Sequence, residues 1–146
     1  ALGATNVIPS KAYLKGTFRT MDENWRAEAL QIIESTAKEL AAANGGTADV
    51  EISKGYPYLE NDPATTAKMR TAAIELLGEE KVEELPIRLT AEDFSYYSQE
   101  IPVCFFRLGV RNEAKGIVFG VHHPKFNIDD NALKIGMQMM ALAPFS

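Results

Sequence analysis

The chain has 146 residues, of which 46% are hydrophobic and 24% charged, and 15 Lys and Arg against 20 Asp and Glu give a net charge of -5 at pH 7. This composition is typical of a soluble globular protein, and the scattered basic residues argue against a nucleic-acid partner. One Cys and two His exclude a disulfide-stapled scaffold and a thiolate metal cage, which favours a reducing, cytoplasmic location. No apolar run approaches the roughly 18 to 20 residues that cross a bilayer, and no signal peptide is visible, so no membrane partner is expected.

The first third of the chain predicts a strand, a helix and a second strand. Apolar and polar residues alternate over 12–20 and again over 48–54, as in half-buried strands. Between them, the capping box at 20–23 opens an amphipathic helix that the sequence Asn-Gly-Gly at 44–46 ends.

A composition shift at 55–63, rich in Gly, Pro and Asn, marks a predicted domain boundary. We place the two domains at residues 1–58 and 59–146, and the alternation of strands and helices predicts an α/β fold. The elements expected after the boundary are a helix from Asp62 and Pro63 to Gly78, a strand at 87–89, a short helix from Thr90, a central strand at 103–108 and a last helix from 129–130 to 141.

Both histidines, His122 and His123, stand in the segment Val-His-His-Pro-Lys-Phe at 121–126. Histidine is a common metal ligand and proton carrier, and a loop between regular elements is a usual place for it. In the alternative interpretation, one His packs under the loop and the other is solvent-exposed. Two adjacent His on an extended segment point apart, so they do not form a metal site alone.

Two further pairs could bind a ligand. Asn6 and Arg19 would make a carboxylate clamp if a hairpin brought them together, because Arg binds carboxylates bidentately. Their alternative roles are a turn residue and a surface arginine. Glu92 and Asp93 could coordinate metal, or could simply stabilise the first turn of a helix through its dipole.

Six short motifs, taken together and in order, resemble the metal-dependent peptidase and amidohydrolase family M20, especially its N-acyl-amino-acid amidohydrolase, hippurate hydrolase and carboxypeptidase-like branch. The motifs that carry the resemblance are Asn6-Val7-Ile8-Pro9, Gly16-Thr17-Phe18-Arg19-Thr20, Tyr56-Pro57 with Asn61-Asp62, Ala91-Glu92-Asp93-Phe94, Phe105-Phe106-Arg107-Leu108-Gly109 and His122-His123-Pro124-Lys125-Phe126.

The resemblance implies that residues 1–58 are the second half of a ferredoxin-like lid or dimerisation domain, through which a homodimer forms. It implies that residues 59–146 are the C-terminal part of a catalytic α/β domain. Asn6 and Arg19 match the residues that engage the substrate carboxylate, and His122 matches the last metal ligand. His123 stands where a small polar residue is usual, and Glu92 and Asp93 match an acidic turn bordering the site.

The same resemblance implies hydrolysis of an N-acyl amino acid or small peptide at a pair of divalent metals, with zinc expected first and manganese, cobalt or nickel open. The general-base Glu and the other ligands have no counterpart in this chain, so we expect no catalytic residue here and no activity from these 146 residues alone. The alternative is a non-catalytic dimerisation module derived from the family. The motifs fix neither the acyl group nor the amino acid.

Overall fold

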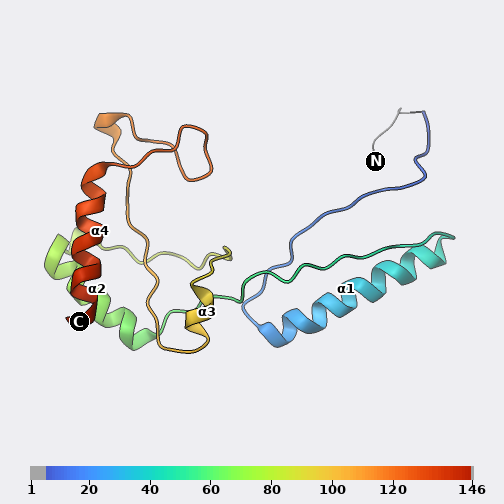
Figure 1. The fold of residues 1–146 in the computed structure, drawn as a ribbon, viewed down its shortest axis with the longest axis horizontal. Helices are drawn as coiled ribbons and strands as arrows, with labels where there is room; N and C mark the ends of the chain where they lie inside the picture. Colours follow the sequence, from blue (N-terminus) through green and yellow to red (C-terminus); the bar gives the residue numbers. More distant parts are fainter. Residues whose placement is uncertain (1–5, 146) are drawn as a thin grey trace. The chain divides into compact units, whose positions relative to one another are not determined.

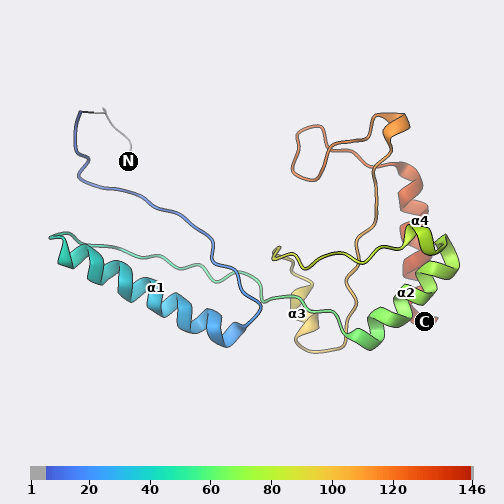
Figure 2. The same cartoon turned by 180° about the vertical axis from the view of Figure 1, so that it is seen from behind.

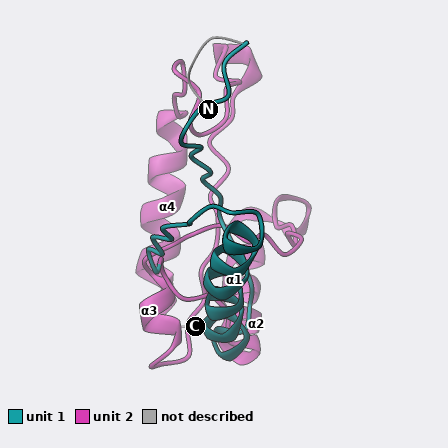
Figure 3. Ribbon diagram, turned by 90° about the vertical axis from the view of Figure 1, so that its right-hand side faces the viewer, with its two compact units in different colours: residues 1–54 teal, residues 55–146 magenta. Residues whose placement is uncertain are grey.

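The structure is a computed structural model that describes residues 6–145, and it divides the chain into two compact units. The first unit is residues 1–54 and the second is residues 55–146, coloured separately in Figure 3. The domain assignment made from the sequence, with its lid and catalytic parts, stays a prediction, because this division says nothing of what either unit does.

The first unit is built on helix α1, Glu23–Ala43, as predicted. Asp22 caps the start of the helix, and its side chain accepts a hydrogen bond from the Trp25 N–H at 2.9 Å. Thr20, the expected cap, instead accepts from the Asp22 N–H at 3.2 Å, one step before the helix. Asn44 caps the end of the helix and is followed by Gly45 at φ 76°, a conformation that glycine adopts without steric cost.

The segments on either side of α1 run as extended traces and are not strands (Figure 1). The alternation at 12–20 had predicted an inward face, but Leu14 on that face is 93% exposed. Alternation indicates which side chains share a face, whereas a sheet also needs a hydrogen-bonded backbone neighbour about 4.8 Å away. Over residues 12–20 and 48–54 the structure shows no such ladder.

The second unit contains helices α2, Pro63–Leu77, α3, Ser95–Ser98, and α4, Asp130–Leu142 (Figure 2). Three short 3-10 turns accompany them, η1 at Glu79–Lys81, η2 at Glu113–Lys115 and η3 at Ala143–Phe145. Asp62 caps α2 with Pro63 in its first turn, and Asp129 caps α4, which confirms both predicted helix starts. Thr90 caps no helix, because α3 begins only at Ser95.

The core of the second unit lies where α2 and α4 pack together. Met69 and Ala73 of α2 and Met139 of α4 are buried against one another. Cys104 packs against this cluster as a half-buried free thiol.

The predicted α/β fold, with its ferredoxin-like half-lid, is wrong. Within residues 6–145 the only β pairing is an isolated antiparallel bridge between Asn112 and Ile117, and the regular elements are helical. The apolar run at 103–108 had predicted a central strand, and Val103 is indeed buried. The backbone of Phe105, however, is hydrogen-bonded by the Asn61 side chain and not by a neighbouring strand. None of the described helices combines the length and apolarity needed to span a membrane.

Candidate functional site

His122 lies at the exposed tip of the turn that follows Gly120. It has φ 70°, and it is the one non-glycine residue among 6–145 with positive φ. The His123 N–H donates to the Gly120 carbonyl at 3.2 Å, which closes the turn and places His122 at its third position. Positive φ at that position is typical of a type II turn and normally favours Gly. No hydrogen bond within the described part of the chain involves the His122 imidazole, so both of its nitrogens remain available.

His123 is held by its neighbours, although its side chain is also exposed. Its Nδ1 accepts a hydrogen bond from the Lys125 backbone N–H at 3.0 Å. Its ring stacks on Phe119, with centroids 4.1 Å apart and planes 8° from parallel. Its carbonyl accepts from the Phe126 N–H at 2.9 Å, which makes His123 the corner between two consecutive turns. The two histidines thus differ in their contacts. The His123 ring is held by a hydrogen bond and a stack, whereas the His122 ring makes no hydrogen bond within residues 6–145.

Asn6 and Arg19, the predicted carboxylate clamp, are both exposed residues of the first unit. Asn6 lies in a turn, and Arg19 lies in the extended segment before α1. Within residues 6–145 no hydrogen bond joins the two side chains. Both are therefore accessible to a ligand from solution, and the clamp itself stays a prediction.

Glu92 and Asp93 lie just before α3. The Glu92 carbonyl accepts from the Ser95 N–H at 3.2 Å, and the Asp93 carbonyl accepts from the Tyr96 N–H at 3.1 Å. Glu92 is half-buried and Asp93 is exposed. These backbone contacts shape the turn into α3. The Glu92 carboxylate also accepts from the Phe94 N–H at 3.5 Å, whereas no hydrogen bond within residues 6–145 involves the Asp93 carboxylate.

No group of three or more His, Cys, Asp or Glu side chains able to hold a metal ion comes together among residues 6–145. A protein metal site of the catalytic kind needs about three protein ligands. His122 fits one such position by its chemistry, because a neutral imidazole with an unbonded nitrogen is a good ligand. The described residues thus fit a single ligand position and not a complete set.

Asp129 organises the base of the loop that carries the histidines, a role that the sequence did not indicate. Its carboxylate accepts from Lys115 Nζ and from Asn112 Nδ2, each at 2.6 Å, and from the Asn131 N–H at 3.3 Å. Its backbone N–H donates to the Val110 carbonyl at 3.0 Å. The Lys115 ammonium, followed by the Asn112 amide, lowers the pKa of Asp129 to about 2. Asp129 therefore joins both ends of the 110–129 loop.

Asn61 is a second residue whose role sequence reasoning missed. Its Oδ1 accepts from the Phe105 N–H at 2.7 Å, and its Nδ2 donates to the Phe105 carbonyl at 2.9 Å. The neighbouring Asp62 N–H donates to the Val103 carbonyl at 2.8 Å. An Asn amide can replace one residue of a neighbouring strand in this way. The motif that contains Asn61 and Asp62 was the only sequence signal here, and it did not indicate a contact with Phe105.

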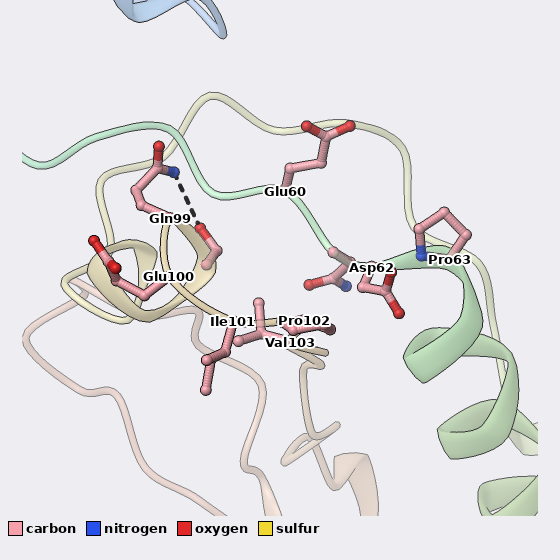
Figure 4. A pocket seen from close by; sticks show the side chains of 10 residues that line it. Glu60, Asp62, Pro63, Gln99, Glu100, Ile101, Pro102 and Val103 are labelled. Atoms are coloured by element: carbon pink, nitrogen blue, oxygen red, sulfur yellow. Dashed lines mark hydrogen bonds between the residues drawn. The ribbon is translucent and has the colours of Figure 1, made fainter.

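A shallow depression of about 390 Å³ lies beside this contact, between the start of α2 and the turn after α3 (Figure 4). Glu60, Gln99 and Glu100 line it together with Pro102 and Val103. It is open to solvent, and none of the predicted site residues lines it. It therefore adds no ligand-binding group to the candidate site.

Comparison with known proteins identifies a family and several similar proteins. The family described as peptidase family M20/M25/M40 matches residues 3–144. Thermostable carboxypeptidase 2 of Saccharolobus solfataricus is 35% identical over 138 residues, which cover 94% of this chain and 34% of that protein. No solved structure matches significantly.

Two further relatives bear names of hydrolases. Putative amidohydrolase YhaA of Bacillus subtilis is 33% identical over 93% of this chain and 34% of its own length. IAA-amino acid hydrolase ILR1-like 6 of Arabidopsis thaliana is 31% identical over 93% of this chain and 30% of its own length. The chain thus spans about a third of the length of the curated relatives that it matches.

Proposed function

The chain belongs to peptidase family M20/M25/M40, and we propose that it contributes to a hydrolase that cleaves the amide bond of N-acyl amino acids or small peptides. The observation that carries the proposal is the family match over residues 3–144, with relatives named carboxypeptidase, amidohydrolase and amino acid hydrolase. A carboxypeptidase and an amino acid hydrolase both act on an amide whose amine side bears a carboxylate. A substrate of this class needs a cationic or hydrogen-bonding partner for that carboxylate.

We propose Arg19 and Asn6 as those partners. Both side chains are exposed, so neither must break a bond within residues 6–145 to meet a substrate. Arg presents a planar donor fork that matches a carboxylate, and the Asn amide adds one more N–H donor. Holding the carboxylate fixes the position of the neighbouring amide relative to the reacting groups.

We propose His122 as one ligand of a divalent metal. Its exposed imidazole, which makes no hydrogen bond within residues 6–145, supports this role. A divalent metal, when bound, would polarise the amide carbonyl and lower the pKa of a bound water. The general base and the remaining ligands are expected from residues outside these 146, in keeping with the third of a relative's length that the chain covers.

The experiment is hydrolysis of an N-acyl amino acid by a full-length protein that contains this chain. Replacing Arg19 by Ala should lower kcat/KM by about 30- to 150-fold, equivalent to about 2–3 kcal/mol for losing a charged hydrogen-bond partner. The matched control is Lys15→Ala, which removes an exposed cation from the same extended segment and should change kcat/KM less than about twofold. Equal effects of the two substitutions, or no hydrolysis by the parent, would contradict the proposal.

A further inference from the structure

Phe119, which precedes His122, and His123 and Lys125, which follow it, contact one another. His122 takes no part in these contacts. We propose that His123 is a positioning residue: it fixes the turn that presents the His122 imidazole and is not itself a ligand. The inference rests on the proposed function only in that His122 there is a ligand of a divalent metal. Its structural part, that His123 holds the turn, stands on contacts within residues 119–126.

The first contact is the hydrogen bond from the Lys125 N–H to His123 Nδ1 at 3.0 Å. In this contact Nδ1 of His123 is the acceptor and the Lys125 backbone is the donor. A side chain that accepts from the backbone two residues ahead forms the same kind of turn as an Asn or Asp side chain. His123 therefore does with an imidazole what a small polar residue does with a carbonyl or hydroxyl oxygen.

The second contact is the stack of the His123 ring on Phe119, with planes only 8° from parallel. The Lys125 ammonium lies 5.9 Å from the centroid of the same Phe119 ring, within the range of a cation–π contact. Lys125 thus meets His123 with its backbone and Phe119 with its side chain. These contacts link Phe119, His123 and Lys125 to one another.

The backbone shows why such a device is needed here. His122 holds φ 70°, a conformation that costs a non-glycine residue energy and persists only when its surroundings impose it. The His123 N–H and carbonyl hold the turns before and after it, at 3.2 Å to Gly120 and 2.9 Å from Phe126. If the His123 side chain loses its contacts with Lys125 and Phe119, the two turns are no longer held in place. His122 can then return to negative φ, which changes the direction in which its imidazole points.

The experiment uses a full-length protein containing this chain and separates the two contacts of His123. His123→Asn keeps an acceptor for the Lys125 N–H and loses the stack, His123→Phe keeps the stack and loses the acceptor, and His123→Ala loses both. Val121→Ala is the control, because Val121 is an exposed residue of the same turn. Each variant is measured for hydrogen exchange of the segment that contains the Lys125 amide and for Zn²⁺ affinity by competition with a chelator.

We expect faster exchange at Lys125 in His123→Ala and His123→Phe, by about tenfold, with parent-like exchange in His123→Asn and Val121→Ala. We expect Zn²⁺ affinity to fall about 10- to 100-fold in the same two variants, as for other residues that orient a metal ligand, and to recover in His123→Asn. Parent-like exchange in His123→Ala would overturn the proposal. Fast exchange in His123→Asn with parent-like exchange in His123→Phe would overturn the hydrogen-bond account.

One more variant keeps the two proposals distinct. If His122→Ala leaves Zn²⁺ affinity unchanged, the assignment of His122 as a ligand fails, while the exchange measurement still decides whether His123 fixes the turn. If His122→Ala weakens Zn²⁺ binding and His123→Ala does not, His122 is a ligand and His123 is not its positioning residue.

Discussion

His122 combines an exposed imidazole with a backbone conformation that favours glycine. Its place in a histidine-bearing loop could be predicted from the sequence, because both histidines stand between Gly120 and an Asp-capped helix. Its positive φ could not be predicted, because nothing in the sequence shows that His122 occupies the third position of a turn closed by Gly120 and His123. A strained non-glycine residue kept at an exposed turn suggests that its side chain is needed there.

Replacing His122 by Gly should therefore raise stability while removing function. We expect the free energy of unfolding to rise by about 1 kcal/mol, because Gly adopts positive φ without steric cost. Val121→Gly, at a neighbouring position without positive φ, should instead lower it by about 0.5–1 kcal/mol. Chemical denaturation of both variants measures this, and a loss of stability in His122→Gly would show that φ 70° costs nothing there.

The Asp129 carboxylate should make stability depend on pH. Its pKa is lowered to about 2 by Lys115 and Asn112, against an ordinary value of 3.8. A carboxyl whose folded pKa is lowered contributes stability that is present above the unfolded pKa and lost as pH falls through the folded value. The contribution of Asp129 should therefore be complete above about pH 4 to 5 and disappear toward pH 2.

The measurement is urea denaturation from pH 6 to pH 2 of a full-length protein containing this chain, comparing the parent with Asp129→Asn. The parent should be more stable at pH 6, and the difference should shrink as pH falls below 4. A difference that stays constant over this range would contradict the assigned role of the carboxylate.

Among the regular elements, helices α1, α2 and α4 were predicted correctly from sequence signals, whereas the predicted strands do not form within residues 6–145. Asp62 with Pro63, and Asp129, mark helix starts because capping depends on residues adjacent in the chain. Strands depend on a partner from elsewhere, which periodicity cannot supply. The run at 103–108 shows the difference, since its predicted sheet neighbour is replaced by one side chain, Asn61.

Asn61→Ala should therefore destabilise the second unit more than removal of an ordinary surface asparagine. We expect a loss of about 1–3 kcal/mol, because both the N–H and the carbonyl of Phe105 lose their partners in a half-buried place. Asn44→Ala is the control: its amide donates one hydrogen bond to the Leu40 carbonyl in an exposed place, and we expect a cost under about 1 kcal/mol. Thermal unfolding of both variants measures the difference, and equal losses would refute the role given to Asn61.

At the scale of the whole molecule, the chain exposes more surface than its length requires. Its accessible surface is 12081 Å². A compact monomer of this size exposes about 7,400 Å², and two separate compact units of 54 and 92 residues expose about 8,900 Å² together. The exposed surface includes large hydrophobic side chains, such as Ile8 at 94%, Leu14 at 93% and Met137 at 67% exposure.

Surface of this kind is normally covered by other polypeptide, either further parts of the same protein or a second copy. We therefore expect the 146-residue chain alone to bind the dye ANS strongly and to unfold over a broad denaturant range, and a full-length protein containing it to do neither. Weak ANS binding with a sharp transition in the isolated chain would show that these residues cover their own apolar surface.

Arg19 is proposed to recognise the carboxylate of an N-acyl amino acid at a hydrolytic site. The most direct test compares kcat/KM for an N-acyl amino acid with that for its carboxamide, in the full-length parent protein and in Arg19→Ala. The parent should prefer the carboxylate by about 30-fold or more, and the preference should fall to near unity in the variant, because the charge on the substrate then has no partner. An unchanged preference in Arg19→Ala would show that Arg19 does not bind the substrate carboxylate.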